Sequence, residues 1–117
     1  MNEIDIARRF VSKHDNAKRN GWEFELSFTE FKKLMNKKKC EYSGLVLTET
    51  DGTNKRTIDR IDNSKGYIKG NVRVVAECVN LYKATLENPN NPLNFEIFEK
   101  MYIAMKQDGL FESHIIG

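Results

Sequence analysis

The stretch TIDRIDNSKGYIKGNVRVV, residues 57–75, contains two short apolar runs separated by turn-forming residues. Thr57–Ile61 alternates apolar and polar side chains, a pattern that predicts a strand. Asn63–Gly66 and Lys69-Gly70 are turn signals, and Asn71–Val75 begins a second extended segment. The stretch therefore predicts a β-hairpin whose connection is rich in polar residues.

Helices are predicted after the hairpin. Residues 76–86 have helical periodicity and would follow the second strand directly. Residues 93–108 predict a C-terminal helix that Asn94 caps and Gly109 ends. The side chains expected on the buried faces of these two helices are Cys78, Val79, Tyr82, Leu86, Phe95, Phe98, Tyr102 and Met105.

The first 39 residues predict a helical N-terminal flank. Residues 3–19 have apolar positions at helical spacing, and Trp22–Leu26 alternates like a short extended segment. Ser27 and Glu30 match a capping box that starts a second helix. That helix is expected to bury Phe28, Phe31, Leu34 and Met35, with Phe24 also in the core.

Between this flank and the hairpin, Leu45–Leu47 predicts a short strand and Asp51–Asn54 a turn. The length of 117 residues suggests a single domain, 1–117. The expected fold class is α+β, with a central β-hairpin plus helix flanked by N- and C-terminal helices.

The composition excludes several classes of protein. Charged residues make up 31% and hydrophobic residues 39%, which is typical of a globular chain. No apolar run is long enough to span a membrane, and the N-terminus does not resemble a signal peptide, so we expect a cytoplasmic protein with no membrane partner. The net charge is only +2, and the basic residues cluster in the first 70 positions, which fits either a nucleic-acid partner or a solvated protein surface.

Polar residues at the ends of the predicted elements form a candidate site. Asp59 near a strand end and Asn80 on the following helix supply a carboxylate and an amide oxygen, which suit Mg²⁺ or Mn²⁺. Asn71 could tie the loop by hydrogen bonds to backbone groups. Arg60 and Lys83 are cations that could face phosphate oxygens. Together these groups predict phosphodiester chemistry.

Four segments in this order resemble the HNH endonuclease family. They are Cys40–Gly44, Thr57–Tyr67, Gly70–Val75 and Val79–Lys83, and the resemblance spans residues 40–83. It is strongest to the small phage-borne subgroup with Asp-Arg-Ile-Asp where most members have Asp-His.

The resemblance implies a ββα-metal, treble-clef-like finger that holds one divalent metal. Asp59 and Asn80 fall on the metal-ligating positions, Asn71 on the asparagine that holds the loop, and Lys83 on a basic position after the site. Arg60 falls on the histidine that serves as general base. Arginine remains protonated at working pH and cannot act as a base.

Three readings of the missing histidine stay open. Asp62 could serve as the base, a metal-activated water could ionise without a protein base, or the site could be inactive. Asp62 also fits a turn residue, and His14 and His114 lie outside the segment that resembles the family. Many members carry a structural zinc bound by two Cys-x-x-Cys pairs. Here the four matching positions are Cys40, Ser43, Ala76 and Val79, so a structural zinc is not expected.

The sequence thus predicts a metal-dependent endonuclease that cuts or nicks double-stranded DNA, encoded by a phage and acting in the host cytoplasm. The candidate catalytic residues are Arg60, Asp62 and Asn71. The alternatives are a catalytically inactive DNA-binding or inhibitory protein of the same fold, and an adaptor that binds a protein partner through its acidic last helix. The candidate DNA-binding residues are Lys37, Lys38, Lys39, Lys65, Lys69, Arg73 and Lys83.

Overall fold

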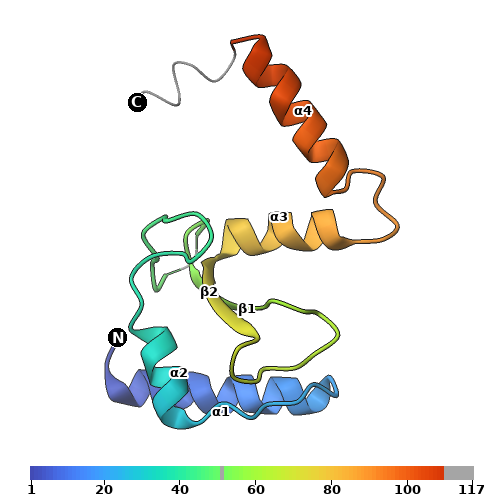
Figure 1. The fold of residues 1–117 in the computed structure, drawn as a ribbon. Coiled ribbons are helices and arrows are strands. Elements are labelled where there is room, and N and C mark those ends of the chain that lie inside the picture. Colours follow the sequence, from blue (N-terminus) through green and yellow to red (C-terminus); the bar gives the residue numbers. More distant parts are fainter. Residues whose placement is uncertain (51, 110–117) are drawn as a thin grey trace. The chain divides into compact units, whose positions relative to one another are not determined.

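The computed structural model describes residues 1–50 and 52–109, and it is a mixed α+β fold. Four helices and a two-stranded antiparallel sheet occur in this part of the chain (Figure 1). The chain divides into two compact units, Met1–Asn80 and Leu81–Gly117. Asp51, at the predicted turn, and His114 lie outside the described residues.

The first two helices form where the sequence predicts them, and the second begins at its predicted capping box. Helix α1 spans Glu3–Arg19 and α2 spans Phe28–Met35. The capping box is confirmed: Glu30 N–H donates to Ser27 Oγ over 3.1 Å, and Ser27 N–H donates to Glu30 Oε1 over 2.9 Å. These reciprocal bonds satisfy backbone N–H groups that a helix N-terminus leaves without partners.

A buried arginine covers the other end of α2. Arg56 Nη1 donates to the carbonyl of Leu34 over 3.4 Å and to the carbonyl of Lys37. Its Nε–H bonds to Glu49 Oε1 over 3.0 Å, so the buried guanidinium has a counter-charge. This arginine joins β1 to the last turn of α2 rather than contributing to the basic surface.

The predicted hairpin is confirmed, with a shift of one residue. Strand β1 spans Arg56–Arg60 and pairs antiparallel with β2, Val72–Ala76, in a register that sets Asp59 opposite Arg73. Ile58 and Val74 face the core with Phe31. Helices α1 and α2 lie on that side of the sheet (Figure 1). Because side chains alternate along a strand, Asp59 and Arg73 project from the opposite face.

Helix α3, Glu77–Glu87, follows β2 without an intervening loop. Cys78 and Val79 pack against the core, as expected. Tyr82 does not: it is 72% exposed, and its predicted burial is wrong. The apolar pattern of α3 continues past the point where the first compact unit ends at Asn80.

The predicted strand Leu45–Leu47 is absent from the regular strands of the described chain. Leu47 N–H donates to Lys38 O and Cys40 N–H donates to Leu45 O, each over about 2.8 to 2.9 Å. The segment therefore pairs with the short run Lys38–Cys40, and the ladder is too short to form a strand. The turn between them uses a positive φ of 76° at Gly44.

The loop between β1 and β2 packs on the extended segment after α1. Tyr67 N–H donates to Glu23 O over 2.8 Å, and Glu25 N–H donates to Tyr67 O over 3.0 Å. A Cβ on Gly66 would lie 2.4 Å from Glu23 O, so only glycine allows the two backbones this approach. The loop is thereby joined to the N-terminal flank.

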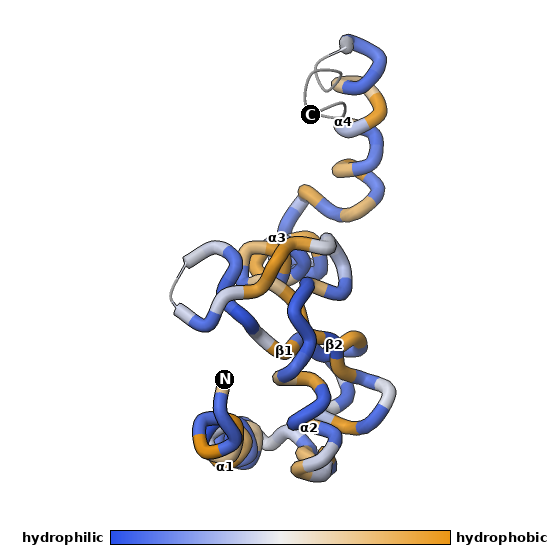
Figure 2. Tube along the Cα trace, turned by 90° about the vertical axis from the view of Figure 1, so that its left-hand side faces the viewer, coloured by the Kyte–Doolittle hydropathy of each residue, from blue (hydrophilic) through white to orange (hydrophobic). Residues whose placement is uncertain are grey.

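Helix α4, Phe95–Gln107, has the predicted Asn94 cap, whose Oδ1 accepts from Ile97 N–H over 3.0 Å. Its apolar side chains were expected in the core, but Phe95, Phe98 and Tyr102 are 54%, 42% and 42% exposed. Figure 2 shows apolar residues spread along α4. Helical periodicity marks an apolar face without determining what covers it.

Candidate functional site

Asp59 and Arg73 lie directly opposite each other on the face of the hairpin that points away from α1 and α2. Asp59 is 6% exposed, and its Oδ2 accepts a hydrogen bond from Tyr42 Oη over 3.4 Å. The Arg73 guanidinium lies 5.4 Å from the centroid of the Tyr42 ring. A carboxylate and a guanidinium are thus gathered around one tyrosine.

Glu41 fixes the segment that carries this tyrosine to β2. Its N–H donates to Val74 O over 2.9 Å, and its Oε2 accepts from Val74 N–H over 2.6 Å. Burial by itself would raise the pKa of Glu41. Hydrogen bonds from Lys37 and Val74 N–H and the nearby charges of Lys37 and Arg73 outweigh it, so the pKa lies below its ordinary value.

Asn71 braces the loop as predicted. Asp62 N–H donates to its Oδ1 over 2.8 Å, and its Nδ2 donates to Asp62 O over 3.2 Å and Gly66 O over 2.9 Å. The side chain is 6% exposed. These bonds hold both ends of the turn 62–66 at the end of the hairpin.

Arg60 has a different environment from the predicted one. Its guanidinium lies 3.6 Å from the Trp22 ring centroid, and Nη1 donates to Asn63 O over 2.9 Å and to Lys65 O over 3.0 Å. A guanidinium stacked on indole and bonded to two carbonyls orders the loop. These are contacts within the protein, and the phosphate-facing role of Arg60 stays a prediction.

Asp62 forms an Asx turn. Its Oδ1 accepts from Ser64 Oγ over 2.6 Å and from Ser64 N–H over 2.9 Å. These hydrogen bonds, followed by the Lys65 charge, hold the pKa of Asp62 below its ordinary value. The geometry fits the turn reading of Asp62 better than the reading as a general base, because a lower pKa weakens a base.

Asn80 lies in the first turn of α3 and is half-buried, within the same compact unit as Asp59. The two residues come from the hairpin and from the helix that follows it, as the sequence predicts, and their convergence on one ion stays a prediction. Lys83, one turn later, forms an ion pair with Glu87 over 2.7 Å and is largely buried.

Three of the seven predicted DNA-binding cations, Lys37, Arg73 and Lys83, have contacts within the protein. Lys37 pairs with Glu41 over 2.8 Å, and Arg73 lies against Tyr42. Four others have exposed side chains: Lys38, Lys39, Lys65 and Lys69. Lys38 and Lys39 come after the end of α2, and Lys65 and Lys69 lie in the loop of the hairpin.

The positions of the zinc knuckle keep their turn although most of the ligands are absent. Burial would raise the pKa of the Cys40 thiol. Hydrogen bonds from the Ser43 hydroxyl and from the N–H groups of Ala76, Ser43 and Tyr42 lower it below its ordinary value. Cys40, Ser43 and Ala76 therefore lie together, and Cys40 is 3% exposed, as expected for a small buried side chain.

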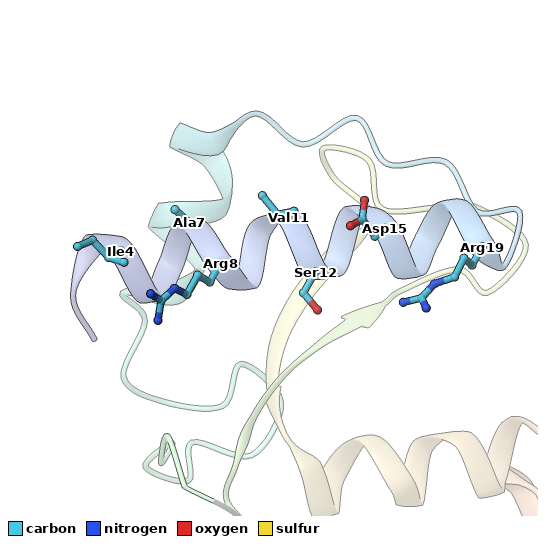
Figure 3. A pocket seen from close by; sticks show the side chains of 7 residues that line it. All are labelled: Ile4, Ala7, Arg8, Val11, Ser12, Asp15 and Arg19. Carbon is cyan, nitrogen blue, oxygen red and sulfur yellow. The ribbon is translucent and has the colours of Figure 1, made fainter.

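Two surface hollows of the described chain are lined by residues other than Asp59. One, of about 600 Å³, runs along a single face of α1 and is lined by residues of that helix from Ile4 to Arg19 (Figure 3). The other, of about 280 Å³, lies between α1 and β1 and includes Arg9, Lys13 and Lys55. His14 is exposed and packs edge-on against Phe24, 5.5 Å between ring centroids.

The ligands expected at Asp59 are oxygen atoms, which suit a hard divalent cation that keeps several water ligands. They are too few for a site in which the protein supplies every ligand. Within residues 1–50 and 52–109, no three His, Cys, Asp or Glu side chains are grouped to hold an ion. Mg²⁺ is commonly held by one or two carboxylates, with water and substrate phosphate completing its shell. That Asp59 and the Asn80 amide together form such a site stays a prediction.

Sequence reasoning missed Tyr42, Glu41 and Trp22. Tyr42 and Glu41 occupy the turn after Cys40, where the resemblance to a zinc knuckle draws attention to the ligand positions only. Trp22 contacts Arg60 across 38 positions of sequence, and periodicity carries no signal for such a pair.

The chain is similar to a phage protein. It is 37% identical over 84 residues to an uncharacterized 29.0 kDa protein of Enterobacteria phage T4, from the dda-modA intergenic region. The match covers 70% of this chain and 34% of the phage protein, so the chain spans about a third of that relative's length. No family model matches the chain. No solved structure matches it either.

None of the helices in the described part of the chain has the length and apolar character to cross a membrane.

Proposed function

We propose that this protein is an HNH-like, metal-dependent endonuclease that nicks or cuts double-stranded DNA. One observation carries the proposal: a β-hairpin runs directly into a helix, with a buried Asp59 on the hairpin and a loop braced by Asn71. A buried carboxylate is stable where it is hydrogen-bonded, paired or bound to a metal, and Tyr42 orients the Asp59 carboxylate on this face. The phage relative is compatible with a role in the bacterial cytoplasm.

The reaction is hydrolysis of a phosphodiester. A water oxygen attacks phosphorus, the bond from phosphorus to the leaving oxygen breaks, and the products are a phosphate monoester and a hydroxyl. A divalent cation held by Asp59 and Asn80 would stabilise the charge that develops on the leaving oxygen. Tyr42 orients the Asp59 carboxylate, and Asn71 and Arg60 keep the loop in one conformation.

The water must lose a proton during the attack. Because Asp62 is bonded to Ser64 and has a lowered pKa, we assign it to the turn rather than to the base. The proton would then pass to solvent, which predicts a rate that increases with pH above neutrality.

The exposed cations would bind the DNA backbone. The side chains of four lysines are exposed: Lys38, Lys39, Lys65 and Lys69. Binding to DNA through such contacts releases counterions, so the affinity falls as the salt concentration rises.

A second candidate is a DNA-binding protein of this fold that does not cleave. The observation in its favour is that Arg60 and Asp62, the residues at and near the position of the family's base, are both bonded within the loop. Both candidates predict salt-dependent binding to DNA.

Supercoiled plasmid separates the two candidates. The protein is incubated with plasmid and Mn²⁺, Mg²⁺ or EDTA, and conversion to open-circular DNA is measured. We expect nicking with metal, none with EDTA, and none with Asp59→Asn. Asp108→Asn, which changes an exposed aspartate at the end of α4, is the matched control and should nick like the wild type.

A gel-shift assay in EDTA completes the experiment. DNA binding without nicking in any metal contradicts the enzyme and supports the binding protein. If the protein gives no nicking and no gel shift, both candidates are contradicted. That outcome favours the adaptor that would bind a protein partner through the last helix.

A further inference from the structure

The geometry points to Tyr42 as a positioning residue that holds Asp59 and Arg73, and to Arg73 as the group that contacts the phosphate to be cleaved. This inference rests on the proposed endonuclease function. It adds a positioning residue that sequence reasoning missed, and it gives Arg73 a role at the reacting phosphate instead of a general contact with DNA.

Tyr42 contacts both partners at once. Its hydroxyl donates to Asp59 Oδ2 over 3.4 Å, and its ring lies 5.4 Å from the Arg73 guanidinium carbon. The hydrogen bond is long, as catalytic hydrogen bonds often are before substrate binds. A single side chain therefore sets the relative orientation of the expected metal ligand and a cation.

The register of the hairpin brings the two groups close. Asp59 and Arg73 are paired residues on adjacent strands, and side chains of such a pair project from the same face about 5 Å from each other at Cβ. A cation bound by Asp59 and the guanidinium of Arg73 would then lie on either side of one phosphate. Arginine suits this place because its N–H groups match two phosphate oxygens.

Arg73 has a donor without an acceptor. Among the described residues, no atom accepts a hydrogen bond from its buried Nε–H. Arg73 would have a purely structural role if it were paired with Glu41, whose charge is close enough to interact with it. However, Glu41 Oε1 accepts from Lys37 and Oε2 from Val74 N–H, so both oxygens already have donors.

The side chain of Arg73 is half-buried rather than enclosed. It can therefore reach an anion at the surface, while Tyr42 is held by the two hydrogen bonds between Glu41 and Val74. A donor that is already oriented stabilises developing charge without reorganisation during the reaction.

The first experiment measures kcat and KM of plasmid nicking in Mn²⁺. We expect Arg73→Gln to lower kcat by roughly 100-fold, because one preorganised donor is removed. Tyr42→Phe should lower kcat by about 10-fold and raise the Mn²⁺ concentration that half-maximal nicking requires, because it loses only the hydroxyl that orients Asp59. Tyr42→Leu also loses the ring and should be slower than Tyr42→Phe. Arg8→Gln and Tyr82→Phe are matched surface controls and should retain wild-type kinetics.

The second experiment needs no variant and no activity. The ¹H–¹⁵N signal of Arg73 Nε is followed during titration of the wild-type protein with inorganic phosphate. A saturable shift that exceeds those of Arg8 and Arg9 supports the phosphate site. No shift overturns it.

The two experiments distinguish the inference from the proposed function. If Asp59→Asn is inactive but folded Arg73→Gln and Tyr42→Leu nick like the wild type, the inference is wrong and the endonuclease stands. If the wild type never nicks but phosphate shifts the Arg73 signal, the catalytic proposal fails and the anion site stands. Circular dichroism of each variant identifies any that do not fold, and Arg73→Lys then replaces Arg73→Gln, with a similar loss of kcat expected.

Discussion

Asn71 shows how much one buried side chain can organise. It accepts one hydrogen bond and donates two, and all three partners are backbone groups of the loop between the strands. Arg60 acts on the same loop from the other side, through Asn63 O and Lys65 O. These side chains add to the backbone hydrogen bonds of the loop, such as that from Ile61 N–H to Asn71 O.

We expect Asn71→Ala to destabilise the fold by about 1–3 kcal/mol, because it leaves buried loop groups without partners. Urea denaturation measures the change in unfolding free energy, and hydrogen exchange should show faster exchange at Asp62 N–H. Asn90→Ala, at an exposed position, is the control and should change stability little. Wild-type stability in Asn71→Ala would contradict the brace.

Glu41 predicts a pH dependence. Its pKa in the folded protein lies below the ordinary value, since Lys37, Val74 N–H and Arg73 outweigh the effect of burial. The unfolded chain therefore takes up the proton first as pH falls, so the stabilisation is complete above the unfolded pKa of about 4.3 and is lost as pH falls through the lower folded pKa.

The measurement is the unfolding free energy of wild type and Glu41→Gln between pH 7 and 3. Glutamine retains an acceptor but no charge, so we expect the variant to be less stable at pH 7 and the difference to shrink toward pH 3. Glu99→Gln, on an exposed part of α4, should show no such convergence. A constant difference across the range would contradict the role of the Glu41 charge.

At the scale of elements, the loop of the hairpin and the segment after α1 depend on each other. Backbone bonds join Tyr67 to Glu23 and Glu25, and Phe24 packs 6.0 Å from the Tyr67 ring. The capping box and the Asn94 cap, by contrast, are local and were predicted correctly. The strand expected at Leu45–Leu47 failed because pairing needs a partner of sufficient length.

Gly66→Ala should destabilise the protein by about 1–3 kcal/mol, because its Cβ would meet the backbone of Glu23 and the two segments would have to separate. Thermal denaturation gives the size of the effect. Gly52→Ala would be a poor control because of its positive φ, so we choose Lys69→Ala for its exposed position in the same loop. A Gly66→Ala protein as stable as the wild type would show that the segments can rearrange at little cost.

At the scale of the whole molecule, the core lies in the first compact unit. The buried hydrophobic residues of the described chain run from Ile6 to Ala76, and α4 contributes none. The apolar side chains of α4 remain largely exposed, so the second unit has little buried core of its own.

We therefore expect a fragment of residues 1–87 to fold cooperatively, with a Tm within about 4 °C of the full chain, which corresponds to a change of about 1 kcal/mol or less in the free energy of unfolding. Calorimetry measures both transitions. Phe31→Ala in the same fragment should lower its stability by about 3–5 kcal/mol, because Phe31 is 1% exposed in the core. An unfolded fragment would show that residues 88–117 contribute to the core.

The sequence by itself determined the elements whose causes are local: the caps of α2 and α4, the hairpin, the helix after it and the brace at Asn71. These depend on neighbouring residues, and alternation or capping chemistry is visible in the order of the chain. Only the tertiary structure decided that Arg60 stacks on Trp22 and that Tyr42 joins Asp59 to Arg73. Each of these contacts depends on which distant segment a side chain meets, and the periodicity of the sequence does not predict such contacts.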